Sequence, residues 1–239
     1  MFYTDIHCHL LSGVDDGAKT PEVMYEMLEL AYLTGTRHIC ATPHCHPEIF
    51  GTNIKKAKRV FSLLQAYARE KHHDMKLSFA NELGYHTAWR KTLEEGKCAL
   101  LGGKYLLVDF PADQSLFEMR YAMDDMLCTG IPVILAHVER YGALYGEYDT
   151  INDWCRRGLF LQMNASAFSK RRSFRERLHV KRLIGKCPIT AVASDGHSLG
   201  SRPPALCRTE ERIARKYGYE KAELWLSKAP TLLLSGKNL

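Results

Sequence analysis

Short apolar runs alternate along the chain with longer stretches in which apolar residues recur every three or four positions. The short runs are typical of buried parallel strands, and the periodic stretches are typical of amphipathic helices. This order indicates successive βα units and therefore an α/β fold with a parallel sheet. We expect seven strands, over residues 2–7, 38–42, 76–80, 105–110, 131–136, 159–164 and 189–194.

The helices expected between these strands carry recognisable start signals. Thr20 is a good N-cap and Pro21 fits the first helical turn, with apolar residues at helical spacing until Gly35. Asn53 begins a second helix that reaches about Lys71. Further helices are expected over residues 115–129, 150–157, 174–184, 205–216 and 220–227. Because no linker, repeat or low-complexity segment divides the chain, we expect residues 1–239 to form one domain, a (β/α) barrel.

The composition narrows the class of protein. Of the 239 residues, 46% are hydrophobic and 25% are charged, which is typical of a globular protein and excludes collagen-like or disordered chains. No run approaches the roughly 18 apolar residues of a membrane span, and the N-terminus lacks a basic region followed by an apolar stretch. We therefore expect a cytoplasmic location. The eight cysteines form no C-x-x-C pair, so we expect reduced thiols rather than disulfides or a zinc ribbon.

The formal net charge of +6 permits an anionic partner without requiring one. Basic residues gather around the start of the expected helix 174–184: Lys170, Arg171, Arg172, Arg175, Arg177, Lys181 and Arg182. They form either a solvated helix face or a contact with an acidic or phosphorylated partner. We expect no nucleic-acid partner.

Residues that can bind metals concentrate where the expected strands end. His7 and His9 close the first strand, and residues two apart on a strand point to the same side, so both rings can converge on one small site. The other strand ends supply His44, Glu82, Asp109, His137, Asp195 and His197. A single histidine there is usually a hydrogen-bonded structural residue. So many buried imidazoles and carboxylates at one rim would be costly unless they were paired or bound to cations, which indicates a multinuclear metal site.

The donor atoms limit the choice of metal. Imidazoles mixed with carboxylates suit zinc, manganese or iron, and the number of carboxylates favours manganese or iron. Cys8 and Cys45 alternate with the histidines and face the other side of the strand, so we expect them to pack rather than to bind. His46 is treated as a bystander, and we expect the remaining histidines to be surface or helix-packing residues: His38, His72, His73, His86 and His179.

Five motifs follow one another along the chain: Asp5-Ile6-His7-Cys8-His9-Leu10-Leu11, Val14-Asp15-Asp16-Gly17-Ala18, Ala41-Thr42-Pro43-His44, Leu135-Ala136-His137-Val138-Glu139-Arg140-Tyr141 and Ser194-Asp195-Gly196-His197. Together they resemble the manganese-dependent protein-tyrosine phosphatases of the polymerase and histidinol phosphatase (PHP) superfamily, of the capsule and exopolysaccharide type. The resemblance covers essentially the whole chain, and the ordered set is specific where H-x-H alone would be weak. It implies a distorted (β/α)7 barrel with its metal site at the C-terminal rim of the strands.

The resemblance also implies a cofactor and a ligand set. The family's site holds two or three divalent ions, manganese foremost, with iron and zinc as alternatives. Its metal ligands match His7, His9, His44, Glu82, His137, Asp195 and His197, with Glu82 as a bridge between ions. Asp109 stands where we expect Glu in the family. Because its side chain is one methylene shorter, Asp109 is either a ligand or a residue that holds a histidine.

Two arginines match the residues that engage the substrate phosphate in this family, Arg140 and Arg202. A planar guanidinium can contact two phosphate oxygens at once and offset charge during phosphoryl transfer. The alternative for Arg140 is a salt bridge, for instance to Glu139. Asp15 and Asp16 lie in a glycine-flanked loop and either orient metal-bound water or shape the turn. We count Asp16, with the two arginines, among the catalytic candidates.

These residues predict hydrolysis of a phosphate monoester by in-line attack of a metal-bridging hydroxide. A cysteine nucleophile is rejected, because no cysteine is followed six residues later by arginine. The chain also lacks a GxxxxGK[ST] loop, which argues against a nucleotide-driven kinase. The resemblance implies that the substrate is phosphotyrosine on a bacterial tyrosine kinase that controls polysaccharide assembly. Three alternatives stay open: a small-molecule phosphatase, such as one for histidinol phosphate, a phosphodiesterase or nuclease, and a module that binds phosphorylated partners without turnover.

Overall fold

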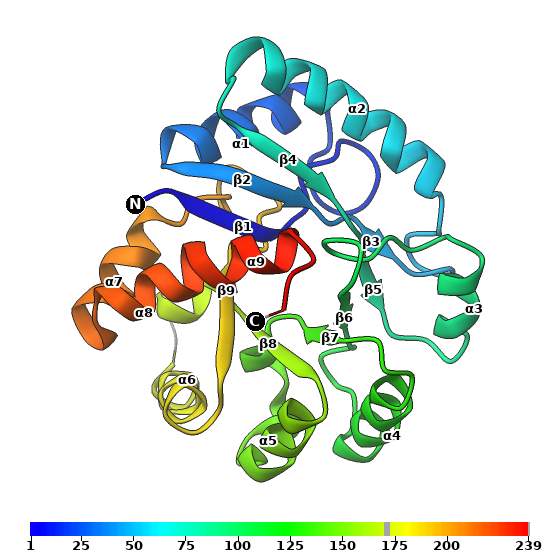
Figure 1. The fold of residues 1–239 in the computed structure, drawn as a ribbon, viewed down its shortest axis with the longest axis vertical. Coiled ribbons are helices and arrows are strands. Elements are labelled where there is room, and N and C mark those ends of the chain that lie inside the picture. Colours follow the sequence, from blue (N-terminus) through cyan, green and yellow to red (C-terminus); the bar gives the residue numbers. More distant parts are fainter. Residues whose placement is uncertain (170–172, 239) are drawn as a thin grey trace.

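Parallel strands form the centre of the fold (Figure 1). The computed structural model describes residues 1–169 and 173–238. Its strands are β1 Tyr3–Cys8, β2 Thr36–Ala41, β3 His44–Cys45, β4 Lys76–Phe79, β5 Glu82–Gly84, β6 Leu106–Asp109, β7 Val133–Leu135, β8 Leu159–Asn164 and β9 Ile189–Ala193. They pair in the orders β1-β2-β4 and β3-β5-β6-β7-β8-β9, and every pairing between these described strands is parallel.

Two of the expected strands are interrupted, and the interruptions join the two sheets. β2 continues into β3, and β4 continues into β5, so each pair occupies one position around the barrel. Across the breaks, the amide of Ala80 donates to the carbonyl of Ala41 at 3.0 Å. On the other side, the amide of His9 donates to the carbonyl of Gly196 at 2.8 Å, which closes β1 against the chain that follows β9. The predicted α/β barrel with seven strand positions is confirmed, and these breaks are its distortion.

Helices surround the strands (Figure 1). The α-helices are α1 Pro21–Leu33, α2 Ile54–Lys71, α3 Trp89–Glu94, α4 Leu116–Leu127, α5 Tyr148–Arg156, α6 Phe174–Lys186, α7 Cys207–Tyr217, α8 Tyr219–Glu223 and α9 Ala229–Leu234. Shorter helical turns are η1 Val138–Arg140, η2 Gly142–Leu144, η3 Ala165–Phe168 and η4 Leu224–Lys228. The Thr20 and Asn53 side chains cap α1 and α2 as predicted. The short α3 was not predicted; its Trp89 indole donates to Asp125 of α4 at 2.9 Å.

The barrel interior is closed at one end by α9, drawn in red in Figure 1. Leu233 and Leu234 of α9 pack with the interior side chains of the strands, among them Ile6, Leu107 and Ile134. We expected the last helix to end at residue 227, and this is wrong, because the chain stays helical through η4 into α9. Pro230 is tolerated because it lies in the first turn of α9, where a missing N–H costs little.

The exposed side of α6 carries the described part of the basic cluster. Arg175, Arg177, Lys181 and Arg182 are exposed on this helix, as a solvated face requires. Lys170, Arg171 and Arg172 lie outside the described residues. Among the residues that the structure covers, no helix has both the length and the apolar character needed to cross a membrane.

Gly102 tests how tightly α9 closes the barrel. A Cβ at Gly102 would lie 2.1 Å from the carbonyl oxygen of Leu233, and Gly102 has φ +59°. We expect Gly102→Ala to lower the free energy of unfolding by about 3 kcal/mol, measured by urea denaturation. Gly103→Ala is the matched control, because Gly103 has φ +71° but nothing within 4 Å, and should cost about 1 kcal/mol. Equal losses in the two variants would contradict the close approach of α9.

Candidate metal centre

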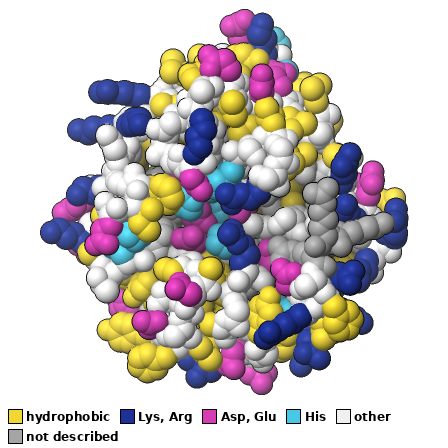
Figure 2. Space-filling view, turned by 180° about the vertical axis from the view of Figure 1, so that it is seen from behind, with side chains coloured by type: hydrophobic (Ala, Val, Ile, Leu, Met, Phe, Trp, Pro, Cys, Tyr) yellow, Lys and Arg dark blue, Asp and Glu magenta, His cyan; other side chains and the backbone are white. Residues whose placement is uncertain are grey.

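Histidine and acidic side chains gather in a hollow on the face opposite α9, with Lys and Arg side chains beside it (Figure 2). This is the end at which the strands finish, as predicted. All eight predicted ligands converge here: His7, His9, His44, Glu82, Asp109, His137, Asp195 and His197. His44 and Asp109 are half-buried and the others are buried.

The Glu82 carboxylate lies at the centre of the group. Its Oε2 atom is 3.2 Å from Nε2 of both His7 and His9 and 3.1 Å from Nδ1 of His44. Its Oε1 atom is 3.0 Å from Nε2 of His137. Despite these distances, Oε2 is buried without a hydrogen-bond partner among the described residues. A buried carboxylate oxygen facing several imidazole nitrogens fits a site for a cation, which these lone pairs would coordinate.

Three overlapping groups of ligand atoms could each hold an ion. They are His7, His9 and Asp195; His44, Glu82 and Asp109; and His9, Asp16, His44 and His197. Within each group, the ligand atoms lie within 4.8 Å of one another. The sharing of His9 and His44 between groups fits a cluster of ions rather than separate sites. Asp16, predicted as a catalytic residue, thus also has the position of a ligand.

The pKa values of Glu82, Asp195 and His197 favour ionised carboxylates and a neutral imidazole, the forms that bind cations. Burial raises the pKa of Glu82, but the neighbouring His7 and His44 outweigh burial and hold this pKa well below its usual range. Burial also opposes ionisation of Asp195, yet the nearby His7 and His9 lower its pKa to about 2. Burial lowers the pKa of His197 to about 4, so this ring is neutral near neutral pH, the form that binds metals.

The pKa of Asp109 moves in the opposite direction. Burial, with the negative charge of Glu82 beside it, raises the pKa of Asp109 well above its usual value. In the absence of a cation, Asp109 therefore keeps its proton more readily than Glu82 does. A bound cation between the two carboxylates would remove the repulsion that causes this shift.

Backbone geometry turns two of the predicted ligands into the site. His137 follows β7 with φ 36°, and Asp195 follows β9 with φ 51°. Both are left-handed conformations that non-glycine residues adopt at a cost, so the surrounding structure must hold them. This backbone conformation places both side chains at the rim immediately after their strands end.

Two polar residues of β8 support the ligands, and the sequence analysis assigned no role to them. The Gln162 amide oxygen accepts from the backbone N–H of His137 at 2.9 Å and lies 3.1 Å from Nδ1 of His7. An amide oxygen can only accept, so Nδ1 of His7 carries the proton and Nε2 keeps its lone pair for a metal. Asn164 donates to Oδ2 of Asp195 at 2.7 Å. The signal was present, because Gln162 and Asn164 alternate at the end of an otherwise apolar strand.

The two neighbouring aspartates have separate roles, which the sequence left open. The buried Asp15 holds His9, since its Oδ2 accepts from Nδ1 of His9 at 2.7 Å and from the His44 amide at 3.0 Å. The half-exposed Asp16 faces the mouth, with Oδ1 3.3 Å from Nε2 of His197. Gly17 permits this loop, because a Cβ there would lie 2.1 Å from the His9 carbonyl oxygen.

Both predicted phosphate-binding arginines reach the same carboxylate oxygen. Nη1 of Arg140 and Nη1 of Arg202 lie 3.2 and 3.4 Å from Oδ2 of Asp195. Arg140 comes from η1, and Arg202 is held by its carbonyl, which accepts from the His197 amide at 2.8 Å. Arg140 therefore pairs with Asp195 rather than with Glu139. Both arginine side chains are partly exposed, at 45% and 37%, so they remain open to an anion entering the mouth.

Comparison with known proteins shows to which family the chain belongs. The family model described as "Capsular polysaccharide synthesis, CpsB/CapC" matches residues 3–235. The chain belongs to the CpsB/CapC family. A curated relative, the tyrosine-protein phosphatase CpsB of Streptococcus pneumoniae, is 30% identical over 225 residues, which cover 92% of this chain and 93% of the relative.

Solved structures show the same fold for this CpsB/CapC member. One belongs to the crystal structures of YwqE from Bacillus subtilis and CpsB from Streptococcus pneumoniae, described as "unique metal-dependent tyrosine phosphatases". It is 22% identical to this chain, with a TM-score of 0.87, and the match covers 99% of this chain and 96% of that one. Histidinol phosphate phosphatase from Lactococcus lactis has a TM-score of 0.56 and 14% identity, with coverage of 92% and 94%. At these identities the structures establish the fold.

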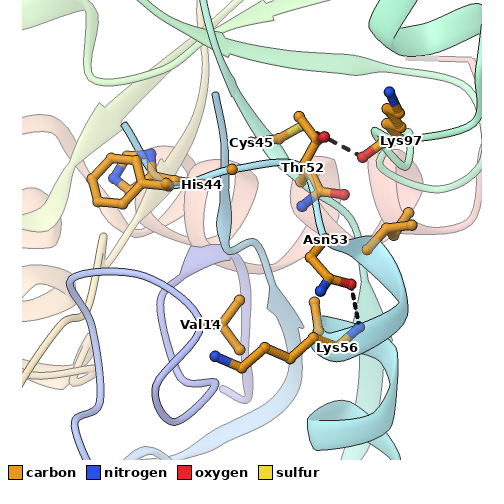
Figure 3. Close-up of a pocket in the computed structure, with 12 residues that line it drawn as sticks. Val14, His44, Cys45, Thr52, Asn53, Lys56 and Lys97 are labelled. Carbon is orange, nitrogen blue, oxygen red and sulfur yellow. Dashed lines mark hydrogen bonds between the residues drawn. The ribbon is translucent and has the colours of Figure 1, made fainter. Parts of the chain in front are cut away.

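A side pocket of about 220 Å³ lies next to the centre in this CpsB/CapC chain (Figure 3). The ring of His44 forms part of its wall and stacks on Phe50, with centroids 4.5 Å apart and planes at 7°. Its two lysines are engaged, Lys56 with the Gly13 carbonyl at 2.6 Å and Lys97 with Glu95 at 2.6 Å. Of these two lysines, only Lys97 has its charge paired with a carboxylate of a described residue, and the pocket wall contacts His44 through the Phe50 ring.

The contact between Asp15 and His9 sets the pKa of His9. Burial lowers the pKa of His9, but the charge of Asp15 outweighs burial and raises it well above its usual value. We expect Asp15→Asn to lower the pKa of His9 in metal-free protein, measured by NMR titration of the imidazole signals. Asp16→Asn is the control, because Asp16 is more exposed and forms its short contacts with His44 and His197, so it should lower the pKa of His9 much less than Asp15→Asn does. An unaltered His9 pKa in Asp15→Asn would contradict this pairing.

Proposed function

We propose that the chain is a metal-dependent protein-tyrosine phosphatase. The observation that carries the proposal is the Glu82-centred cluster of imidazoles and carboxylates with two partly exposed arginines over Asp195. Metal ligands together with guanidiniums at one open mouth suit a phosphate ester as substrate. The relative from Streptococcus pneumoniae is a tyrosine-protein phosphatase, which supports the same substrate for this chain.

The residues present fit a cluster of divalent ions. We assign its ligands as predicted: His7, His9, His44, Glu82, Asp109, His137, Asp195 and His197, with Asp16 joining them at the mouth. Two or three ions, manganese in our proposal, would acidify a water molecule and neutralise phosphate charge when bound. Carboxylates in each of the groups favour manganese or iron over zinc, and no cysteine belongs to them.

The arginines and Asp16 act on the substrate and its water. Arg140 and Arg202 approach Asp195 from different loops, so together they can hold the oxygens of one phosphoryl group in a fixed orientation. Their positive charge also offsets the charge that spreads over these oxygens during transfer. Asp16, half-exposed beside His44 and His197, is placed to orient a water molecule at the mouth.

The mouth suits a group presented by a protein. The arginines are exposed at its edge, and a phosphotyrosine side chain is long enough to reach inward while its main chain stays outside. The phenol leaving group, of pKa about 10, makes less demand on a general acid than an alkoxide does. The capsular family suggests a bacterial tyrosine kinase of polysaccharide assembly, in the cytoplasm, as the partner.

The decisive experiment is a substrate panel with elemental analysis of the purified protein. We expect bound manganese or iron, and a kcat/KM at least about tenfold higher on a phosphotyrosine peptide than on histidinol phosphate or a phosphodiester. His7→Ala and Asp195→Ala should abolish turnover while circular dichroism stays unchanged, because each removes a ligand. Faster turnover of histidinol phosphate, or bound metal without hydrolysis of any phosphoester, would overturn the proposal.

Gln162 gives a test of the metal centre that does not depend on turnover. We expect Gln162→Leu to weaken divalent metal binding about 10- to 100-fold, because it frees the His7 ring and the His137 amide. Isothermal titration of the metal-free protein with manganese measures the change. Gln162→Glu keeps an acceptor oxygen and should bind metal more tightly than Gln162→Leu. Equal affinity in the two variants would remove Gln162 from the support of the site.

A further inference from the structure

A second groove, of about 470 Å³, adjoins the mouth and shares Arg202 with it. Its walls come from η3, the loop after β9 and the first turns of α7. The lining includes three arginines, Arg202, Arg208 and Arg212, and several hydroxyl side chains, but none of its lining residues is acidic. The groove is therefore a cationic extension of the site that receives the phosphate.

The two arginines beyond Arg202 have guanidiniums available for a ligand. Arg208 is exposed, and Arg212 is half-buried with only a long contact of 3.4 Å from Nη1 to the Phe168 carbonyl. Neither forms an ion pair within residues 1–169 and 173–238. Two other exposed arginines do pair with carboxylates, Arg90 with Asp125 and Arg157 with Asp124.

The start of α7 adds to the positive potential of the groove. This helix has 11 residues, its N-cap is Leu206, and no side chain caps its first amides. The amides of Thr209 and Glu210 donate to the Leu206 carbonyl at 3.0 and 2.9 Å, so the first turn presents the N–H groups of Cys207 and Arg208 and the positive end of the helix dipole. Glu210 lies in the same turn but does not line the groove. Arg208 and Thr209, in the same turn, line the groove.

We propose that this groove is a second anion subsite, which binds an acidic or phosphorylated side chain of the same peptide whose phosphotyrosine is hydrolysed. The inference rests on the proposed function. A carboxylate and a phosphate share the chemistry that the guanidiniums recognise. Because Arg202 belongs to both cavities, the second anion lies close to the first along the peptide. Three extended residues span at most about 10 Å, so the subsite reads side chains within about three positions of the phosphotyrosine.

The test compares three peptides that differ only around one phosphotyrosine. One carries glutamates at the three flanking positions on each side, one carries glutamines there, and one carries a second phosphotyrosine. We expect kcat/KM to be about tenfold higher for both anionic peptides than for the glutamine peptide, mainly through KM. The double variant Arg208→Gln with Arg212→Gln should bring this ratio close to 1. Turnover of p-nitrophenyl phosphate, which has no second anion, should stay unchanged.

Arg215→Gln with Lys216→Gln is the matched control. It removes the same charge from the exposed last turn of α7, outside the groove, and should keep the preference for anionic peptides. Equal turnover of all three peptides by the unaltered chain overturns the subsite while leaving the proposed function intact. A preference that survives the groove variant, or is lost equally in the control, overturns it too. Failure to hydrolyse any of the peptides would instead contradict the proposed function.

Discussion

One buried carboxylate shared by four imidazole rings is the interaction on which the rest of the structure depends. Glu82 faces His7, His9 and His44 with one oxygen and His137 with the other. A buried carboxylate such as Glu82 stays ionised only where positive charge, from an imidazolium or a bound cation, lies next to it. The barrel must therefore bring four segments that are distant in sequence to within hydrogen-bond distance of one another, and must hold them there.

The barrel achieves this by departing from regular strand geometry at four of the candidate ligands, His44, Glu82, His137 and Asp195. The second and third strand positions are broken just before His44 and Glu82, and Asn81 bridges the break by donating to the Pro43 carbonyl at 2.9 Å. The chain takes left-handed turns at His137 and does so again at Asp195. If the strands continued in regular geometry, these side chains would follow the barrel wall instead of turning towards Glu82. The distortions of the fold and the positions of the ligands thus have the same origin.

The sequence predicted the barrel and the convergence of the eight candidate ligands because both leave local signals, namely apolar runs and metal-binding residues directly after them. It assigned no role to Gln162 and Asn164, because polar amides at the end of an apolar strand indicate buried hydrogen bonds but do not indicate their partners. Nor could it separate Asp15 from Asp16, because adjacent residues in a turn diverge only once the loop has a defined conformation. The groove beside Arg202 joins residues 165–169 to residues 194–212, so no local pattern in the sequence marks it.

The packing of α9 has a consequence for the order in which the molecule can be assembled during synthesis. Leu233 and Leu234 fill the same interior as residues of the first strand, such as Ile6. All the residues of the candidate centre are synthesised before these two leucines are added. Until then the barrel lacks the plug at its base, so a nascent chain would reach its cation-binding geometry only after translation of nearly its whole length.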